Sequence, residues 1–178
     1  MRKIIYYIAT SVDGFIAGPG DDIGGFAHQQ ELVDKYMADL KDFDMVIMGR
    51  RTYEFGYAYG LKPGQLAYPH MRHYIFSKTL NFENAHEKLA ICDLDINIIK
   101  DLKETSETDI YLCGGGKFAG WLLNNELIDV LKIKLNPVLL GKGIQLFSEV
   151  EKQYKLELKE SEAFPDGFFI KTYAIIYN

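Results

Sequence analysis

The chain has 178 residues, of which 48% are hydrophobic and 25% charged, and its net charge is −5. These values predict one soluble globular domain over residues 1–178 and argue against nucleic acid or an anionic membrane as the main partner. No apolar run approaches the length of a membrane span, and the N-terminus lacks a signal-peptide pattern, so we expect a cytoplasmic protein. The two cysteines, Cys92 and Cys113, form no CxxC pair or His cluster, which argues against a metal site or a disulfide.

The chain begins with a predicted strand, a loop and a predicted helix. Residues 3–10 are a continuous apolar run, which predicts a buried central strand, and a turn-rich loop follows them. Residues 30–41 repeat with a helical period, which predicts an amphipathic helix packed on a sheet. Its apolar face would carry Leu32, Val33, Tyr36, Met37 and Leu40, and its solvent face Asp34, Lys35 and Asp39.

Two predicted strands are followed at once by glycine and a helix start. The strand at 44–49 ends in Gly49 before Arg50 and Arg51, and the strand at 110–113 leads into three glycines and a helix over 117–124. A helix N-terminus carries unpaired N–H groups and partial positive charge, and glycine lets an anion approach the backbone. Arginine also pairs bidentately with phosphate. Both junctions are candidate anion sites. The alternative is that the glycines only allow tight turns and that the arginines are ordinary exposed side chains in a surface loop.

Between these junctions lie a long aromatic connection, two strands and a helix. Residues 55–73 are rich in aromatic side chains, which favours a wall of a substrate pocket, although the loop could instead only pack on the fold. Strands are predicted at 74–78 and 89–92, and Asp93 or Asp95 would cap a helix over 96–103. The histidines form no metal constellation, and His70 and His73 either face a substrate or, as we favour, lie in a surface loop.

The C-terminal third contains predicted strands alone. Residues 129–140 alternate and then become apolar around Pro137, which is typical of an edge or bulged strand. Residues 154–161 and 168–177 predict an antiparallel hairpin across the turn at 164–167. Helices alternate with strands earlier in the chain, so the predicted class is α/β, a mixed sheet with flanking helices and a C-terminal antiparallel hairpin.

The glycine motif favours a particular kind of nucleotide. Gly114-x-Gly116-x-x-Ala119 satisfies the loose Rossmann fingerprint, but it comes late in the chain, and Lys132-Ile-Lys134 stands where an acidic residue would hold a ribose. No Walker A sequence occurs. Two cationic helix N-termini, with Ser77 and Lys78 at another strand end, suit a dinucleotide with an extra phosphate. We therefore predict NADP rather than NAD.

At this point the motifs resemble a known family. Met48-Gly-Arg-Arg-Thr-Tyr-Glu54, Phe76-Ser-Lys78 and Cys113-Gly-Gly-Gly-Lys117 resemble the cofactor motifs of dihydrofolate reductases. Ser11-Val-Asp-Gly-Phe-Ile-Ala17 and Asn136-Pro-Val-Leu-Leu-Gly-Lys-Gly143 are similar to the reductase domain of bifunctional riboflavin-biosynthesis deaminase/reductases. The resemblance implies a dihydrofolate-reductase-like sheet of about eight strands, NADPH binding, reduction of a small-molecule substrate and often a homodimer.

The resemblance also implies roles for individual residues, which fall into three sets. It implies a phosphate-binding set: Gly49, Arg50, Arg51, Thr52, Ser77 and Lys78. It implies a second set at the pyrophosphate: Gly114, Gly115, Gly116, Lys117 and Phe118. It implies a third set along the nicotinamide: Asp13, Gly14, Ile16, Ala17 and Cys113.

The sequence offers one candidate for the proton donor. In dihydrofolate reductases a carboxylate on the first helix manages the proton, and an ungapped count from Gly49 puts Val33 there, with Asp34 beside it. Asp34 is the catalytic candidate; the alternative is a solvated helix carboxylate. Cys113, where the riboflavin domain has glutamate, is interpreted as a buried pocket residue rather than a redox thiol. Two functions stay open: an NADPH-dependent reductase of a pyrimidine or pterin, and an NADP-binding protein without turnover.

Overall fold

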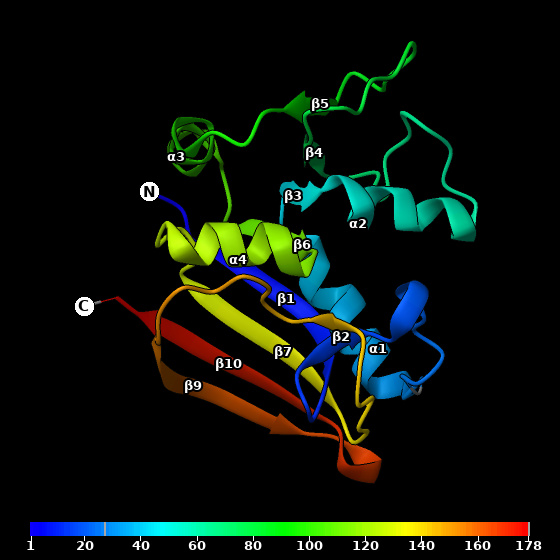
Figure 1. Ribbon diagram of the computed structural model, residues 1–178, viewed down its shortest axis with the longest axis vertical. Coiled ribbons are helices and arrows are strands. Elements are labelled where there is room, and N and C mark those ends of the chain that lie inside the picture. Colours follow the sequence, from blue (N-terminus) through cyan, green and yellow to red (C-terminus); the bar gives the residue numbers. More distant parts are fainter. Residues whose placement is uncertain (27, 178) are drawn as a thin grey trace.

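A mixed sheet of eight strands lies at the centre of the computed structural model, which describes residues 1–26 and 28–177 (Figure 1). The strands of this sheet are β1 (Ile4–Ser11), β3 (Met45–Gly49), β4 (Arg72–Phe76), β5 (Leu89–Cys92), β6 (Ile110–Gly114), β7 (Val130–Asn136), β9 (Lys155–Ala163) and β10 (Phe169–Ile176). Their order is β5-β4-β3-β6-β1-β7-β10-β9; the first six run parallel, and β10 and β9 are antiparallel to their neighbours. The predicted α/β class with a sheet of about eight strands is confirmed.

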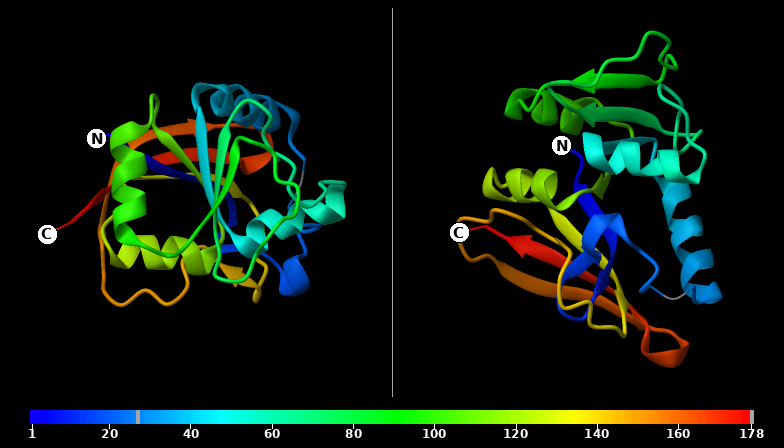
Figure 2. Two further views of the ribbon diagram at one scale, coloured as in Figure 1. Left: turned by 90° about the horizontal axis from the view of Figure 1, so that it is seen from above. Right: turned by 45° about the vertical axis from the view of Figure 1, so that its right-hand side comes forward.

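Helices cover both faces of this sheet (Figure 2). The helices are α1 (Gln30–Asp39), α2 (Arg50–Phe55), α3 (Ile96–Thr105) and α4 (Gly116–Asn124), with short 3₁₀ turns η1 (Pro19–Asp21), η2 (Leu40–Asp42), η3 (Gly56–Tyr59) and η4 (Pro165–Gly167). Ile99 of α3 and Leu122 of α4 pack with Tyr6 in one core, whereas Leu32 of α1 packs with Tyr7 in the other. Because Tyr6 and Tyr7 are both fully buried, β1 is the predicted central strand. None of the helices in the described part of the chain combines the length and hydrophobicity needed to cross a membrane.

The predicted faces of α1 need two corrections. Leu40 is buried at the end of the helix, but Met37, predicted on the apolar face, is 54% exposed. Asp39, predicted on the solvent face, is turned toward the sheet, where its carboxylate accepts hydrogen bonds from Lys132 Nζ at 2.7 Å and the Tyr7 hydroxyl at 3.0 Å. The periodicity was misleading because the sheet presents polar groups to this helix, so a carboxylate gains partners by facing inward.

Strand β7 is an interior strand, so the prediction of an edge or bulged strand was wrong. It lies between β1, to which it is parallel, and β10, to which it is antiparallel. Leu131 is buried on one face, while Lys132 and Lys134 point toward α1 on the other, and this explains the alternation along the strand. Pro137 follows the last residue of the strand and therefore removes no ladder hydrogen bond.

Two local predictions are confirmed. Asp95, rather than Asp93, caps α3, because its carboxylate accepts the N–H of Asn97 at 2.8 Å. Strands β9 and β10 form the predicted antiparallel hairpin across residues 164–168.

A second, two-stranded sheet was not predicted. It pairs β2 (Phe15–Ala17) with β8 (Ile144–Gln145) in antiparallel register. The Leu146 N–H also donates to the Gly14 carbonyl at 2.9 Å. These contacts hold the loop after β1 against the loop after β7, at the edge of the main sheet where the parallel strands end.

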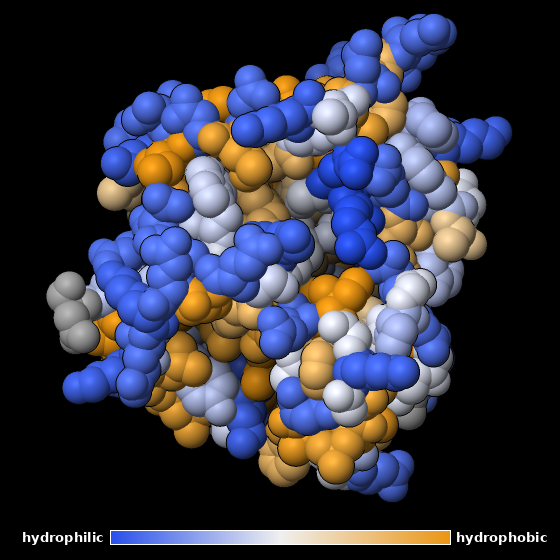
Figure 3. Space-filling model, viewed as in Figure 1, coloured by the Kyte–Doolittle hydropathy of each residue, from blue (hydrophilic) through white to orange (hydrophobic). Residues whose placement is uncertain are grey.

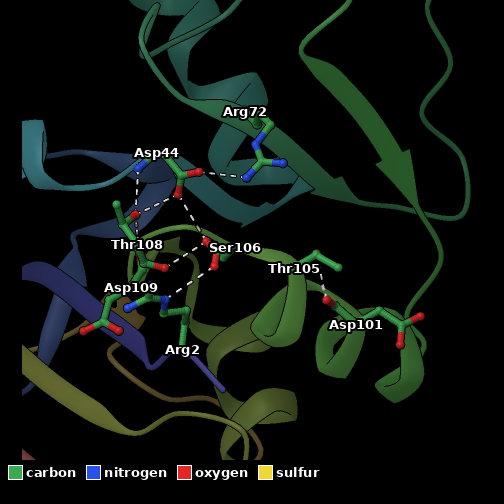
Figure 4. Close-up of polar contacts among 8 residues, drawn as sticks. All are labelled: Arg2, Asp44, Arg72, Asp101, Thr105, Ser106, Thr108 and Asp109. Atoms are coloured by element: carbon green, nitrogen blue, oxygen red, sulfur yellow. Dashed lines mark hydrogen bonds and ion pairs between the residues drawn. The ribbon is translucent and has the colours of Figure 1, made fainter.

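A polar network fastens the opposite edge of the sheet, where the parallel strands begin (Figure 4). Asp44 precedes β3, and its carboxylate accepts from Arg72 at 2.7 Å, from Thr108 at 2.7 Å and from Ser106 at 3.1 Å. Arg72 begins β4, and Thr108 lies just before β6. One half-buried carboxylate therefore links the starts of three neighbouring strands.

We expect Asp44→Ala to lower the free energy of unfolding by about 1–3 kcal/mol, because the substitution removes the acceptor that these donors share. Burial on its own would raise the pKa of Asp44, but hydrogen bonds from Thr108, Arg72 and Ser106 outweigh it and lower the pKa. The Asp44 carboxylate therefore contributes to the free energy of unfolding above the pKa of an unfolded aspartate. This contribution is lost as the pH falls through the lowered pKa of Asp44 in the folded protein.

Urea unfolding at neutral and acidic pH measures this effect. The control is Asp42→Ala, an exposed aspartate two residues earlier, which should change the free energy of unfolding by less than about 0.5 kcal/mol. Equal losses in the two variants would contradict the role of the network.

Candidate functional site

A large cleft lies at the edge of the sheet where the parallel strands end. Its volume is about 1830 Å³, more than the roughly 300–1,000 Å³ that holds one drug-sized molecule. On the face in Figure 3 the surface is hollowed between the regions of α2 and α4, and hydrophilic side chains rim the hollow. In open α/β sheets, ligands bind outside the carboxyl ends of the strands. The cleft is therefore the candidate site, with room for two ligands together.

The N-terminus of α4 forms one wall of the cleft. No side chain in the described residues caps this helix at Gly115, and its first intrahelical bond is from the Ala119 N–H to the Gly115 carbonyl at 2.9 Å. The N–H groups of the first turn are therefore available to a ligand, and the helix dipole favours an anion there. Gly116 is required by close packing, because a Cβ on it would lie 2.2 Å from the Gln145 carbonyl oxygen.

The N-terminus of α2 begins at the end of the neighbouring strand β3. Gly49 precedes the helix, again without a side-chain cap, and the Thr52 hydroxyl faces Gly115, where a Cβ would approach it to 3.0 Å. Arg51 pairs with both carboxylate oxygens of Asp21 at 3.1 Å. Two uncapped helix starts thus lie close together at the cleft.

The cations here are exposed and held only by surface partners. Arg50 donates to the Thr79 hydroxyl at 3.2 Å, and Lys117 pairs with Glu149 at 3.0 Å. Exposed ion pairs contribute about 0–1 kcal/mol, so a phosphate could replace these partners at small cost. We call the part of the cleft formed by Arg50, Arg51 and Lys117 with Gly115 and Gly116 the cationic end.

The structure brings most of the predicted site residues to the cleft but not all. Those that line it are Ile16, Ala17, Gly49, Arg50, Arg51, Thr52, Cys113, Gly115, Gly116, Lys117 and Phe118. Those outside its lining are Asp13, Gly14, Asp34, Ser77, Lys78 and Gly114.

Local hydrogen bonds explain two residues outside the lining. The Asp13 carboxylate accepts from the Ser11 hydroxyl at 2.6 Å and from the Leu140 and Gly141 N–H groups, so it joins the two loops beside the cleft. The Ser11 hydroxyl is the largest cause of its lowered pKa. The Ser77 hydroxyl oxygen accepts the N–H groups of the turn that follows it.

Asp34, the predicted catalytic carboxylate, lies on the exposed side of α1. Its carboxylate accepts a hydrogen bond from the Gln30 side chain at 2.7 Å. Its neighbour Val33, at the ungapped position, lines the cleft instead. Within residues 1–26 and 28–177, no group of three or more His, Cys, Asp and Glu side chains could hold a metal ion.

The other part of the cleft, which we call the tyrosine end, is built from Tyr36, Tyr68, Tyr111 and Cys113. The Tyr36 and Tyr111 hydroxyl oxygens are 2.6 Å apart, and the Tyr68 hydroxyl lies 3.5 Å from the Cys113 sulfur. Burial raises the pKa of all three phenols and of the Cys113 thiol. These groups are therefore neutral, and Cys113 lacks the thiolate character of a redox cysteine.

Lys134 completes the tyrosine end and was missed as a site residue. Its Nζ lies 3.3 Å from the centroid of the Tyr36 ring, and it lines the cleft. Burial lowers the pKa of Lys134 to about 8. The signal in the sequence was the alternation of Lys132 and Lys134 in an otherwise apolar strand, which places both lysines on one face.

The aromatic loop contributes Tyr68, which a buried histidine holds in place. The His73 Nε2 accepts the Tyr68 N–H at 3.2 Å, and its Nδ1 lies 3.1 Å from the Met71 carbonyl. His73 is fully buried on β4, so the surface-loop interpretation was wrong for it; His70 is exposed. Burial lowers the pKa of His73 to about 4, so the ring is neutral and serves packing.

Comparison with known proteins identifies the family. The family model described as the RibD C-terminal domain matches residues 2–170. The chain belongs to the RibD C-terminal domain family. This confirms the resemblance seen in the motifs. A relative in Bacillus subtilis, the uncharacterized protein YwjB, is 30% identical over 164 residues, with 92% of each chain covered.

Solved structures agree with this membership of the RibD C-terminal domain family. A putative riboflavin biosynthesis protein from Shewanella sp. PV-4 is 25% identical with a TM-score of 0.82, covering 99% of this chain and all of that one. The Thermotoga maritima deaminase/5-amino-6-(5-phosphoribosylamino)uracil reductase has a TM-score of 0.69 at 18% identity; 97% of this chain matches 56% of that one. Enterococcus faecalis dihydrofolate reductase complexed with NADP(H) has a TM-score of 0.68 at 15% identity, covering 97% of this chain and 96% of that one. The last two likenesses show the shared fold.

Proposed function

We propose that this RibD C-terminal domain protein is an NADPH-dependent reductase of a small heterocycle of the pyrimidine or pterin type. One observation carries the proposal: two uncapped helix N-termini and three exposed cations share one cleft with an end built from three tyrosines, Cys113 and Lys134. The family membership and the riboflavin-biosynthesis relative of known structure support the reductase class.

The residues of the cationic end fit a dinucleotide phosphate. In the proposal, the first-turn N–H groups of α4, from Gly116 to Phe118, bind the pyrophosphate, with Thr52 beside them. Arg50 and Arg51 bind the 2′-phosphate, which replaces Asp21 as the partner of Arg51. Ser77 and Lys78 lie outside the cleft lining, and the turn after Ser77 holds its hydroxyl, so we assign the larger part to the arginines.

The nicotinamide would lie between the two ends of the cleft, beside Ile16, Ala17 and Cys113. Bound NADPH supplies the hydride. The protein orients the two rings and limits the access of water. Asp13 and Gly14 act on this region through the loop that they hold, rather than by contact.

We expect Arg51→Ala to weaken NADPH binding about tenfold and NADH binding much less, because it removes a charge-assisted contact to the 2′-phosphate alone. Asp21→Asn should strengthen NADPH binding, since it removes the carboxylate that competes for Arg51. Fluorescence titration of NADPH and NADH measures both effects.

The control is Arg2→Ala, an arginine whose Nε donates to the Ser106 carbonyl far from the cleft, and it should change neither affinity. Equal losses for NADPH and NADH in Arg51→Ala would contradict the 2′-phosphate assignment. Negligible affinity of the wild-type protein for both cofactors would contradict the proposed function.

A nucleotide-binding protein without turnover is the second candidate. The exposed position of Asp34 favours it, because this carboxylate cannot deliver a proton into the cleft from there. NADPH absorbance followed with dihydrofolate and with pyrimidine substrates separates the two functions: the reductase consumes NADPH with at least one of them.

We also propose that the protein forms a homodimer through the outer edge of the sheet. Strand β9 ends the sheet, is nine residues long and is exposed on both faces. Leu156, Leu158 and Ile176 are 48%, 54% and 38% exposed at this edge. A long edge strand with unpaired backbone groups and exposed leucines is a template for another chain, and a second copy would cover it.

We expect Leu158→Lys to convert the dimer to a monomer, because a lysine ammonium cannot be buried unpaired in an interface. Leu139→Lys is the control, since Leu139 is 71% exposed in the loop after β7. Light scattering coupled to size exclusion gives the mass. A monomeric wild-type protein would contradict the proposal.

A further inference from the structure

Two lysines on one face of β7 have very different surroundings. Lys132 Nζ pairs with the Asp39 carboxylate at 2.7 Å. Lys134, two residues later, has no hydrogen-bond acceptor or carboxylate partner at its Nζ among residues 1–26 and 28–177; its contact is the face of the Tyr36 ring. Lys134 is half-buried, and an ammonium taken partly out of water without a paired anion is costly, which packing alone does not offset.

The groups around Lys134 come from every neighbouring element. Tyr36 lies above it on α1, and Cys113 and Tyr111 project from β6. Its cross-strand partners are Ala9 on β1 and Ile170 on β10. Beyond Ile170 lies Glu162 of β9, whose charge acts on Tyr7 and Lys35 rather than on Lys134.

These surroundings set the charge state of Lys134. Burial is the largest cause of its lowered pKa of about 8, and Cys113 is the ionisable group that opposes the shift. The acidic side chains that line the cleft are engaged elsewhere: Asp21 with Arg51, Glu149 with Lys117, and Asp22 with the Gly24 N–H. Lys134 is thus a cation with a readily released proton, facing neutral groups.

We propose that the Lys134 ammonium is the proton donor of the reaction and that the substrate presents a carbonyl oxygen or imine nitrogen to it. The inference rests on the proposed function, in which NADPH supplies the hydride. The hydride adds to the carbon of the C=O or C=N bond, and the π electrons move to the heteroatom, which takes a proton from Lys134. NADPH is oxidised to NADP⁺, and the Lys134 amine regains a proton from water in the cleft.

This assignment also narrows the substrate class. A donor without a neighbouring carboxylate binds hydrogen-bond acceptors and negative charge, and it repels a protonated amidine edge. The tyrosine end therefore favours a planar ring that presents carbonyl groups over a ring that presents a cationic 2-amino edge.

The test uses 2,4-dinitrophenolate, a planar anion whose oxygen imitates the negative heteroatom formed by hydride addition. Its absorbance reports binding to the free protein. Wild-type affinity should fall as the pH rises through about 8, because the Lys134 ammonium is lost there. Lys134→Met should weaken binding at neutral pH by about tenfold or more and remove the pH dependence. The control is Lys171→Met, which removes a lysine on β10 whose Nζ lies 5.3 Å from the centroid of the Phe169 ring. It should change neither the phenolate affinity nor its pH dependence.

Lys134→Arg keeps a charge at every pH, so it should retain the affinity and lose the decline above pH 8. This variant keeps the test sharp if Lys134→Met folds poorly. NADPH titration of the same proteins separates the two claims. If the proteins bind NADPH but the phenolate affinity is the same with and without Lys134, or no phenolate binds, the inference about Lys134 is wrong while the proposed function stands. If the wild-type protein does not bind NADPH, the proposed function itself is wrong.

Discussion

The close approach of helix α4 to the end of β8 and the residues after it is the constraint on which the candidate site depends. A Cβ on Gly116 would lie 2.2 Å from the Gln145 carbonyl oxygen, and one on Gly120 would lie 1.8 Å from the Ser148 carbonyl oxygen. The two glycines are four residues apart and so share one face of the helix. Because this face packs backbone against backbone, the helix N-terminus stays beside the cleft, and its first-turn N–H groups remain available there.

The two ends of the cleft use charge in opposite ways. At the cationic end, Arg51 and Lys117 are exposed, and their carboxylate partners can be exchanged for a ligand anion at small cost. At the tyrosine end, Lys134 is desolvated against Tyr36 and has no carboxylate to exchange. One end thus suits a permanent anion, and the other suits a group that becomes negative only as the reaction proceeds.

The periodic parts of the fold were predictable from the sequence, and the parts set by tertiary contact were not. Apolar runs and the glycine junctions predicted β1, β3, β6 and the starts of α2 and α4, because burial on both faces leaves a clear pattern. Asp39, which is half-buried, and His73, which is buried, were misplaced because the partner of Asp39 lies far away along the chain and that of His73 lies in a turn. Lys134 was overlooked because a lysine in an alternating strand is expected to face solvent, and the sequence does not show that α1 covers this face of β7.

The central claim, that both helix starts bind one NADPH, is tested most directly by amide NMR of the isotope-labelled protein during an NADPH titration. The account predicts that the largest chemical-shift changes fall on the amides from Gly115 to Phe118 and from Arg50 to Thr52. The same titration with NADH should leave the second group much less affected. Changes confined to other parts of the chain, or no saturable change at all, would contradict it.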